Sequence, residues 1–254
     1  MRIMRKIAAC EYHQYLDKAR GITANAVYPC SIAEGIQTGE IYVSEDPGIQ
    51  AVLFWHFCGF GYIAGTPSDA FLEDVYQKML SLDRFRRLLL ITDDPNVIRF
   101  FADRGASLRE RIEYRYPQNA CMNVPGIPDP FQIVRIDEKL LSEIHGRIIP
   151  SFSWDSPERF LKYGFGYAAC AEGKVSAAAF SAAVSFEEID IGAETCEPYR
   201  GQGLSSALGM HMCREILRLG KRPVWAHAAS NTGSMKTALR CGFEKDRITY
   251  TIQI

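Results

Sequence analysis

The 254-residue sequence lacks the patterns that several large classes of protein require. Its eight cysteines form no C-x-x-C pair and no cysteine–histidine cluster at zinc spacing, which excludes a zinc-finger type of site and disfavours a disulfide framework. No run is long and apolar enough to span a bilayer, and the charged N-terminus precedes no apolar segment. These absences predict a cytoplasmic protein with reduced thiols, no membrane partner and no bound metal.

An excess of charge of one sign is also missing. Twenty-nine lysines and arginines face 30 aspartates and glutamates, so the formal net charge is −1. This balance gives no general attraction to nucleic acid, and we expect no nucleic-acid partner. Hydrophobic residues make up 47% of the chain, as in ordinary globular proteins, and its length allows one large or two modest domains.

Strand-like and helix-like segments alternate along the first half. One or two helices are expected near the start of the chain, over residues 7–15. An amphipathic helix is predicted to begin at Thr66, and a second one to begin after Asp94 and end at Gly105. Strands are predicted where β-branched and aromatic residues cluster: 40–44, 51–57, 87–92 and 111–116.

The stretch 117–130 holds four prolines and a glycine. Proline removes a backbone donor and disfavours regular structure, so this stretch is the best linker in the chain. We therefore predict an N-terminal α/β domain over 1–120, a linker over 121–130 and a second domain over 131–254.

The second half repeats the alternation with clearer boundaries. Strands are predicted over 166–171, 174–184, 187–195, 223–228 and 248–254. Helices are predicted within 138–148, over 204–219 and from Asn231 to Gly242.

The two halves share a pattern near their ends. Asp94 lies eleven residues before Gly105, and Asn231 lies eleven residues before Gly242. Each helix so bounded leads into Arg-Ile-x-Tyr, which ends at Tyr114 in the first half and at Tyr250 in the second. The shared order of elements predicts a duplicated unit.

A glycine-containing loop, Arg200-Gly201-Gln202-Gly203-Leu204, lies between a predicted strand and an amphipathic helix. Two glycines let the backbone turn tightly and expose successive amides at a helix N-terminus, which suits a diphosphate. Ser206 replaces the third glycine of G-x-G-x-x-G, and no G-K-[ST] is present, so the loop matches neither common nucleotide fingerprint. An anion site is favoured over a plain strand-to-helix turn.

Three elements in order give the chain its resemblance to a known family. They are Thr195-x-x-x-Tyr199-Arg200-Gly201-Gln202-Gly203-Leu204, Asn231-x-x-Ser234 and Gly242-Phe243. Together they resemble the GCN5-related N-acetyltransferase (GNAT) superfamily, over about residues 131–254. Within the superfamily, the chain resembles a bacterial group with an extra N-terminal domain at Trp154, residues 160–166 and Trp225.

The resemblance implies a fold of class α/β (α+β). The C-terminal half would be a GNAT fold with a central mixed, mostly antiparallel sheet flanked by helices, preceded by a degenerate GNAT-like α/β half. Because the first half has no equivalent of the glycine loop, we expect one cofactor site per protomer. The first half would either cover one side of the acceptor cleft or mediate homodimerisation.

The resemblance also implies acetyl-CoA (coenzyme A) as cofactor. Amides of residues 200–205 would hold its diphosphate, and the backbone of residues 194–196 would pair with the pantetheine arm. Asn231 and Ser234 would lie beside the pantetheine and the departing thiol. Asn231 is equally suited to cap its helix. The implied cofactor residues are Thr195, Cys196, Arg200, Gly201, Gln202, Gly203, Leu204, Ser205, Asn231 and Ser234.

A general base must take a proton from an ammonium acceptor. Glu188, Asp190 and Glu194 alternate on one strand and would share a face if no bulge intervenes. Glu194 and Asp190 are the preferred candidates, and the alternative is a solvated strand end. Many family members protonate the thiolate with a tyrosine at the position of Ala238. Transfer here would then proceed without that acid, or Tyr250 would supply the proton.

The function implied is direct acetyl transfer to an amine of a small molecule or peptide. Two alternatives stay open. One is a tandem-GNAT peptidyltransferase that uses aminoacyl-tRNA, which the near-neutral charge disfavours. The other is a non-catalytic acyl-CoA-binding module, which Ala238 favours. His227 and Cys196 are predicted to be structural.

Overall fold

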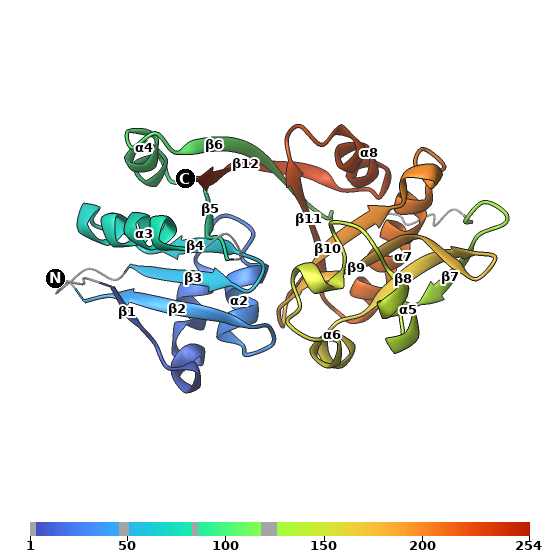
Figure 1. Cartoon of the computed structure of the whole chain (residues 1–254), viewed down its shortest axis with the longest axis horizontal. Coiled ribbons are helices and arrows are strands. Elements are labelled where there is room, and N and C mark those ends of the chain that lie inside the picture. The colour runs from blue at the N-terminus through green and yellow to red at the C-terminus, as the bar shows by residue number, and fades with distance from the viewer. Residues whose placement is uncertain (1–3, 46–50, 83–85, 118–125) are drawn as a thin grey trace. The chain divides into compact units, whose positions relative to one another are not determined.

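The computed structural model describes residues 4–45, 51–82, 86–117 and 126–254 (Figure 1). They form two compact units, Met1–Ile112 with Arg247–Ile254, and Glu113–Asp246. The last eight residues therefore group with the first unit, whereas the sequence placed them in the second domain. Much of the predicted linker lies outside the described residues, so the linker itself stays a prediction.

The first unit is built on a mostly antiparallel sheet. Its strands, in spatial order, are β1 (Met4–Lys6), β2 (Gly39–Ser44), β3 (Val52–His56), β4 (Phe60–Ala64), β5 (Leu89–Thr92) and the C-terminal part of β12 (Glu244–Gln253). The β4–β5 pair is parallel, and the other pairs described for this unit are antiparallel. Tyr250 of β12 lies opposite Thr92 of β5, which explains why the end of the chain belongs to this unit.

Helices cover both faces of this sheet. One face carries η1 (Ala9–Tyr15), α1 (Leu16–Arg20) and α2 (Val27–Ala33), and the other carries α3 (Asp69–Ser81) and α4 (Pro95–Ala102). Alternation along β3 sends Phe54 into the core under α2 and Trp55 into the core under α3. Both side chains are almost completely buried.

The second unit repeats this plan. Its strands, in spatial order, are the end of β6 (Ser107–Arg115), β11 (Arg222–Ala228), β10 (Glu188–Thr195), β9 (Lys174–Val184), β8 (Gly166–Ala171) and β7 (Gln132–Arg135). The β10–β11 pair is parallel, and the pairs from β7 to β10 are antiparallel. Its helices are α5 (Glu138–Glu143), η2 (Pro150–Phe152), α6 (Pro157–Tyr163), η3 (Glu197–Tyr199), α7 (Leu204–Arg218) and α8 (Thr232–Arg240).

The helix α7 packs on β8, β9 and β10 (Figure 1). The opposite face of the sheet carries an aromatic group in which the ring of Phe160 lies 5.8 Å from that of Trp154 and 6.4 Å from that of Phe180. None of the helices in the described part of the chain has the length and apolar character needed to cross a bilayer.

The predicted duplication is confirmed by the matching order of elements. A strand, a helix and a parallel strand follow one another as β4–α3–β5 and as β10–α7–β11. Asp94 and Asn231 cap the next helix in each half. The last strand of each half then completes the other unit, since Glu113–Arg115 of β6 belong with β11 and Arg247–Gln253 of β12 belong with β5.

The structure corrects several predicted boundaries. The helix predicted from Thr66 begins at Asp69, because the side chain of Ser68 caps it by accepting the amide of Phe71. The strand predicted from residue 248 already begins at Glu244. The segments α2, β4, β7 and α6 were not predicted.

Candidate functional site

The glycine loop adopts a backbone shape that favours glycine at two positions. Gly201 and Gly203 have φ angles of 81° and 83°, in the left-handed region. A Cβ at either position would meet no atom within 4 Å, so glycine is needed here for its conformation and not for close packing. Gly203 is the N-cap of α7 and provides no side-chain cap. The first amides of α7 are therefore available to an anion.

The corresponding helix of the first half, α3, has a capped N-terminus. The Ser68 hydroxyl accepts the Phe71 amide at 3.2 Å and caps α3. A side chain thus occupies the place that an anion would take. The contrast between these two helices supports an anion site at the start of α7 and not at the start of α3.

The strands β10 and β11 diverge beside this loop. Their parallel pairing runs from Glu188–Arg222 to Asp190–Val224, and no later pair joins them in the described structure. On its other edge β10 stays paired with β9 as far as Thr195–Ala177. Residues 191–195 therefore present one strand edge that an extended ligand with amide groups can use.

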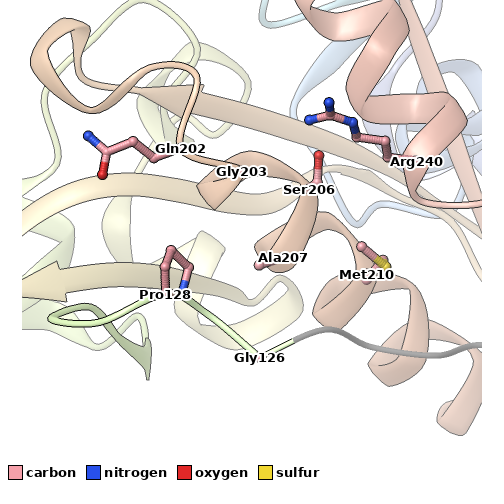
Figure 2. A pocket seen from close by; sticks show the side chains of 8 residues that line it. All are labelled: Gly126, Pro128, Gln202, Gly203, Ser206, Ala207, Met210 and Arg240. Carbon is pink, nitrogen blue, oxygen red and sulfur yellow. The ribbon is translucent and has the colours of Figure 1, made fainter.

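A pocket of about 410 Å³ lies at the loop and the first turns of α7 (Figure 2). One face of α7 provides much of its wall, and the end of α8 provides an arginine. α8 can lie close to α7 because position 209 is glycine, where a Cβ would be 2.7 Å from Cys241 Sγ. The lining residues are Gly126, Pro128, Gln202, Gly203, Ser206, Ala207, Met210 and Arg240.

The end of β10 is joined to the start of α7 by hydroxyl groups. Thr195 Oγ1 lies 2.5 Å from Ser205 Oγ. The next residue, Cys196, donates its amide to Ser176 O and its thiol to Val175 O, so it packs against β9 as predicted. The proposed cofactor residues Thr195, Cys196 and Ser205 therefore lie together, at the junction of strand and loop.

Asn231 and Ser234 are engaged with each other and with β11. Asn231 Oδ1 accepts the Ser234 amide at 3.0 Å, which confirms its predicted capping role. Ser234 Oγ accepts Trp225 Nε1–H at 3.0 Å. This hydrogen bond fixes the first turn of α8 beside β11, and a role next to the pantetheine stays a prediction.

The three carboxylates of β10 have different surroundings. Glu188 forms an ion pair with Arg222 at 3.0 Å. Asp190 is only 4% exposed, and Glu194 is partly exposed. The register between β10 and β9 shifts just after Asp190, and the extra residue is Ala182 in β9, so the alternation of β10 itself is not interrupted.

Alternation along β10 places Asp190, Gly192 and Glu194 on the face away from α7, because Thr195 faces Ser205. The ring of Phe180 lies against Gly192, where a Cβ would be only 2.7 Å from it. An aromatic ring thus packs over the strand position that lies between the two preferred carboxylates in the sequence.

The structure shows where Tyr250, the candidate acid, lies, and how Ala238, at the usual tyrosine position, is packed. Tyr250 lies in β12 and belongs to the first unit, whereas the loop and the carboxylates belong to the second. Ala238, at the usual tyrosine position, is completely buried. Its small side chain therefore belongs to the packing of α8.

A buried tyrosine–histidine pair was not predicted. Tyr114 Oη lies 3.1 Å from His227 Nε2, and His227 Nδ1 lies 2.8 Å from Ala228 O. His227 therefore donates from Nδ1 and accepts the Tyr114 hydroxyl at Nε2, which fits its predicted structural role. Burial raises the pKa of Tyr114. The repeated Arg-Ile-x-Tyr was the available signal, since it places Tyr114 at the position equivalent to Tyr250.

Known acetyltransferases resemble the chain along most of its length. A model of the GNAT acetyltransferase family matches residues 20–252. The uncharacterized N-acetyltransferase YdfB of Bacillus subtilis (strain 168) is 22% identical over 231 residues, which are 87% of each chain.

Solved structures share the fold over both halves. A GCN5-related N-acetyltransferase-like protein from Streptococcus suis is 23% identical, with a TM-score of 0.74 over 97% of this chain and 99% of that chain. A tandem GNAT protein from the clavulanic acid biosynthesis pathway is 12% identical, with a TM-score of 0.66 over 98% of this chain and 96% of its own. The chain belongs to the GNAT acetyltransferase family, and it is an acyltransferase enzyme.

Proposed function

We propose that this protein transfers an acetyl group from acetyl-CoA directly to an amine of a small molecule or peptide. One juxtaposition supports this proposal most strongly. The unpaired edge of β10 runs through η3 into a glycine loop at an uncapped helix N-terminus. A strand edge that can pair with amides, followed by an anion site, suits a ligand with a pantetheine arm and a diphosphate.

Residues of the second unit suit two parts of coenzyme A, the diphosphate and the pantetheine arm. The amides from Gly201 to Ser205 would hold the diphosphate, and Arg240 adds positive charge at the adjoining pocket. The edge of residues 191–195 would pair with the pantetheine amides. When bound, acetyl-CoA supplies the acetyl group as an activated thioester.

The carboxylates of β10 would prepare the acceptor. We propose that Glu194 takes the proton from the ammonium group, with Asp190 as second candidate, because Glu194 is the more exposed of the two. For the departing thiol the sequence leaves two possibilities, transfer without a protein acid or a proton from Tyr250, and Tyr250 belongs to the first unit. Positioning and electrostatics, without a covalent enzyme intermediate, would then suffice for transfer.

Calorimetric titration with coenzyme A and a thiol-release assay with a panel of amines test this function. We expect coenzyme A to bind, and acetyl-CoA to release thiol only when a suitable amine is added. Initial rates should give the intersecting pattern of direct transfer. Parallel lines would contradict direct transfer, and the absence of coenzyme A binding would contradict the proposal as a whole.

The same assay separates the alternatives. Binding of acetyl-CoA without thiol release, with amines of every class in the panel, would indicate a non-catalytic binding module, the reading that Ala238 favours. Transfer that requires aminoacyl-tRNA in place of acetyl-CoA would indicate a peptidyltransferase.

A further inference from the structure

Arg200, the residue that opens the glycine loop, is held by the end of β10. Its Nε donates a hydrogen bond to Thr195 O at 3.2 Å. Its Nη2 lies 3.6 Å from Glu194 Oε1. The guanidinium is therefore directed toward the strand in this structure, although it stands at the edge of the proposed diphosphate site.

Glu194 has a second and quite different anchor. Its Oε2 accepts the amide of Ile148 at 3.1 Å. The segment that carries Ile148 can lie on this side chain because it passes through Gly146, where a Cβ would be only 2.7 Å from Glu194 Cγ. One carboxylate oxygen thus faces a fixed backbone donor, and the other faces a movable cation.

The Arg200–Glu194 contact is the weaker of the two anchors. The Arg200 side chain is 61% exposed, and the separation of 3.6 Å is long for a charge-assisted hydrogen bond. Exposed ion pairs contribute little to stability because water competes for both partners. An arginine forms stronger, bidentate bonds with phosphate groups, and the amides of the loop would hold a phosphate next to Arg200.

We propose that Glu194 and the diphosphate of coenzyme A compete for Arg200. Cofactor binding would draw the guanidinium to the diphosphate and release one oxygen of the Glu194 carboxylate. The Ile148 amide would keep this carboxylate in place, ready to accept the proton of the amine. The inference rests on the proposed function and adds to it a coupling between the cofactor and the residue that prepares the acceptor.

This coupling is tested by whether Glu194→Gln raises or lowers the affinity for coenzyme A. If Glu194 competes for Arg200, Glu194→Gln raises the affinity for coenzyme A by about two- to fivefold, the amount that one exposed ion pair represents. If Glu194 instead holds Arg200 in its binding position, the same substitution lowers the affinity. Glu197→Gln is the matched control, because it removes an exposed carboxylate three residues along the chain. It should change the affinity much less.

Arg200→Met completes the test. It should weaken coenzyme A binding by about tenfold, and adding Glu194→Gln to it should bring no further change. Circular dichroism and thermal melting would show that all variants are folded. Weaker binding by Glu194→Gln, or an equal gain with Glu197→Gln, would overturn the inference. Since wild-type binding of coenzyme A is measured in the same titrations, failure of the proposed function itself would be recognised separately.

Turnover gives a second, independent readout. At saturating acetyl-CoA, Glu194→Gln should bind the cofactor more tightly yet lower kcat by about 100-fold, the usual contribution of a general base. Arg200→Met should instead raise the KM for acetyl-CoA by about tenfold, as its weaker cofactor binding requires, so the two variants should change KM in opposite directions. A higher KM in both variants would show that the two residues act as one fixed unit, and would contradict the exchange of partners.

Discussion

Thr195 Oγ1 lies 2.5 Å from Ser205 Oγ and joins the last residue of β10 to the first turn of α7. The two hydroxyls stand on either side of the glycine loop, so their hydrogen bond fixes the span that the loop must cross. A ligand bound both to the strand edge and to the loop amides would depend on this span.

Thr195→Val should therefore affect stability and cofactor binding together. The substitution keeps the shape but removes the hydroxyl, so we expect a loss of about 1 kcal/mol in the free energy of unfolding. The affinity for coenzyme A should fall severalfold. Urea denaturation and calorimetry measure the two effects. Thr195→Ser keeps the hydroxyl and is the control, and an equal loss of affinity in that variant would show that the hydrogen bond is not the cause.

Gly203→Ala tests the conformation of the loop. Alanine in the left-handed region costs about 1 kcal/mol, and the open space around position 203 adds no steric penalty. Gly220→Ala is a matched control, because Gly220 has a φ of 72° with equally open surroundings, at the other end of α7. Both variants should lose similar stability in urea denaturation, but only Gly203→Ala should weaken coenzyme A binding, by about tenfold. Similar affinities would separate the loop from the cofactor.

Arg240→Met tests the charge at the pocket. Arg240 lines the pocket, and no ion pair to it appears among the described residues (Figure 2). Its removal should weaken coenzyme A binding by about tenfold, because arginine–phosphate bonds are strong and charge-assisted. Lys236→Met removes an exposed charge from the same helix and should have a small effect in the same calorimetric titration. Equal losses would indicate general attraction and not a specific contact.

The buried His56 predicts a dependence of stability on pH. Burial lowers the pKa of His56 from its ordinary value of 6.5 to about 3. Below about pH 6.5 the unfolded chain binds a proton at this position and the folded chain does not. The free energy of unfolding should therefore fall as the pH is lowered from about 6.5 toward 3, by up to about 1.4 kcal/mol per pH unit.

Urea denaturation between pH 7 and pH 5 measures this effect. His56→Gln should have a flatter dependence than the wild type, whatever its absolute stability. His13→Gln removes an exposed histidine and should leave the slope unchanged. Parallel curves for the wild type and His56→Gln would show that His56 does not cause the dependence.

Regular, strongly patterned elements could be predicted from the sequence. The predicted limits of β8 and β9 agree with the structure, and the apolar stripe of α7 is buried at Leu204, Leu208 and Met212. The helix predicted over 204–219 ends at Arg218, and Leu219 is 47% exposed because it follows the last helical turn. The missed elements carry misleading residues. α2 contains Pro29, and β4 contains Gly61, which lies so close to Leu88 that a Cβ would be 2.4 Å from its Cδ1.

The site was predictable only where neighbouring residues form it. The glycine loop and the Asn231 cap follow from local sequence, and both have the expected conformation. The contact between Glu194 and Ile148 joins residues 46 positions apart, and no local pattern indicates it. The pairing of Tyr250 with Thr92 is equally non-local. Since β6 and β12 carry the same Arg-Ile-x-Tyr pattern, the local sequence does not indicate which of them pairs with β5.

Because each half provides the last strand of the other unit, neither unit is complete until the whole chain has been synthesised. When only the first half has emerged from the ribosome, β6 is present, but its end belongs with β11. The strand that pairs with β5, β12, has not yet been made. That edge stays open until the final residues emerge, and open edges are sites of aggregation. A gene for this protein cannot be divided at its internal repeat and still encode two finished domains. A deletion of the first half would also remove the end of β6, which belongs to the sheet of the second unit.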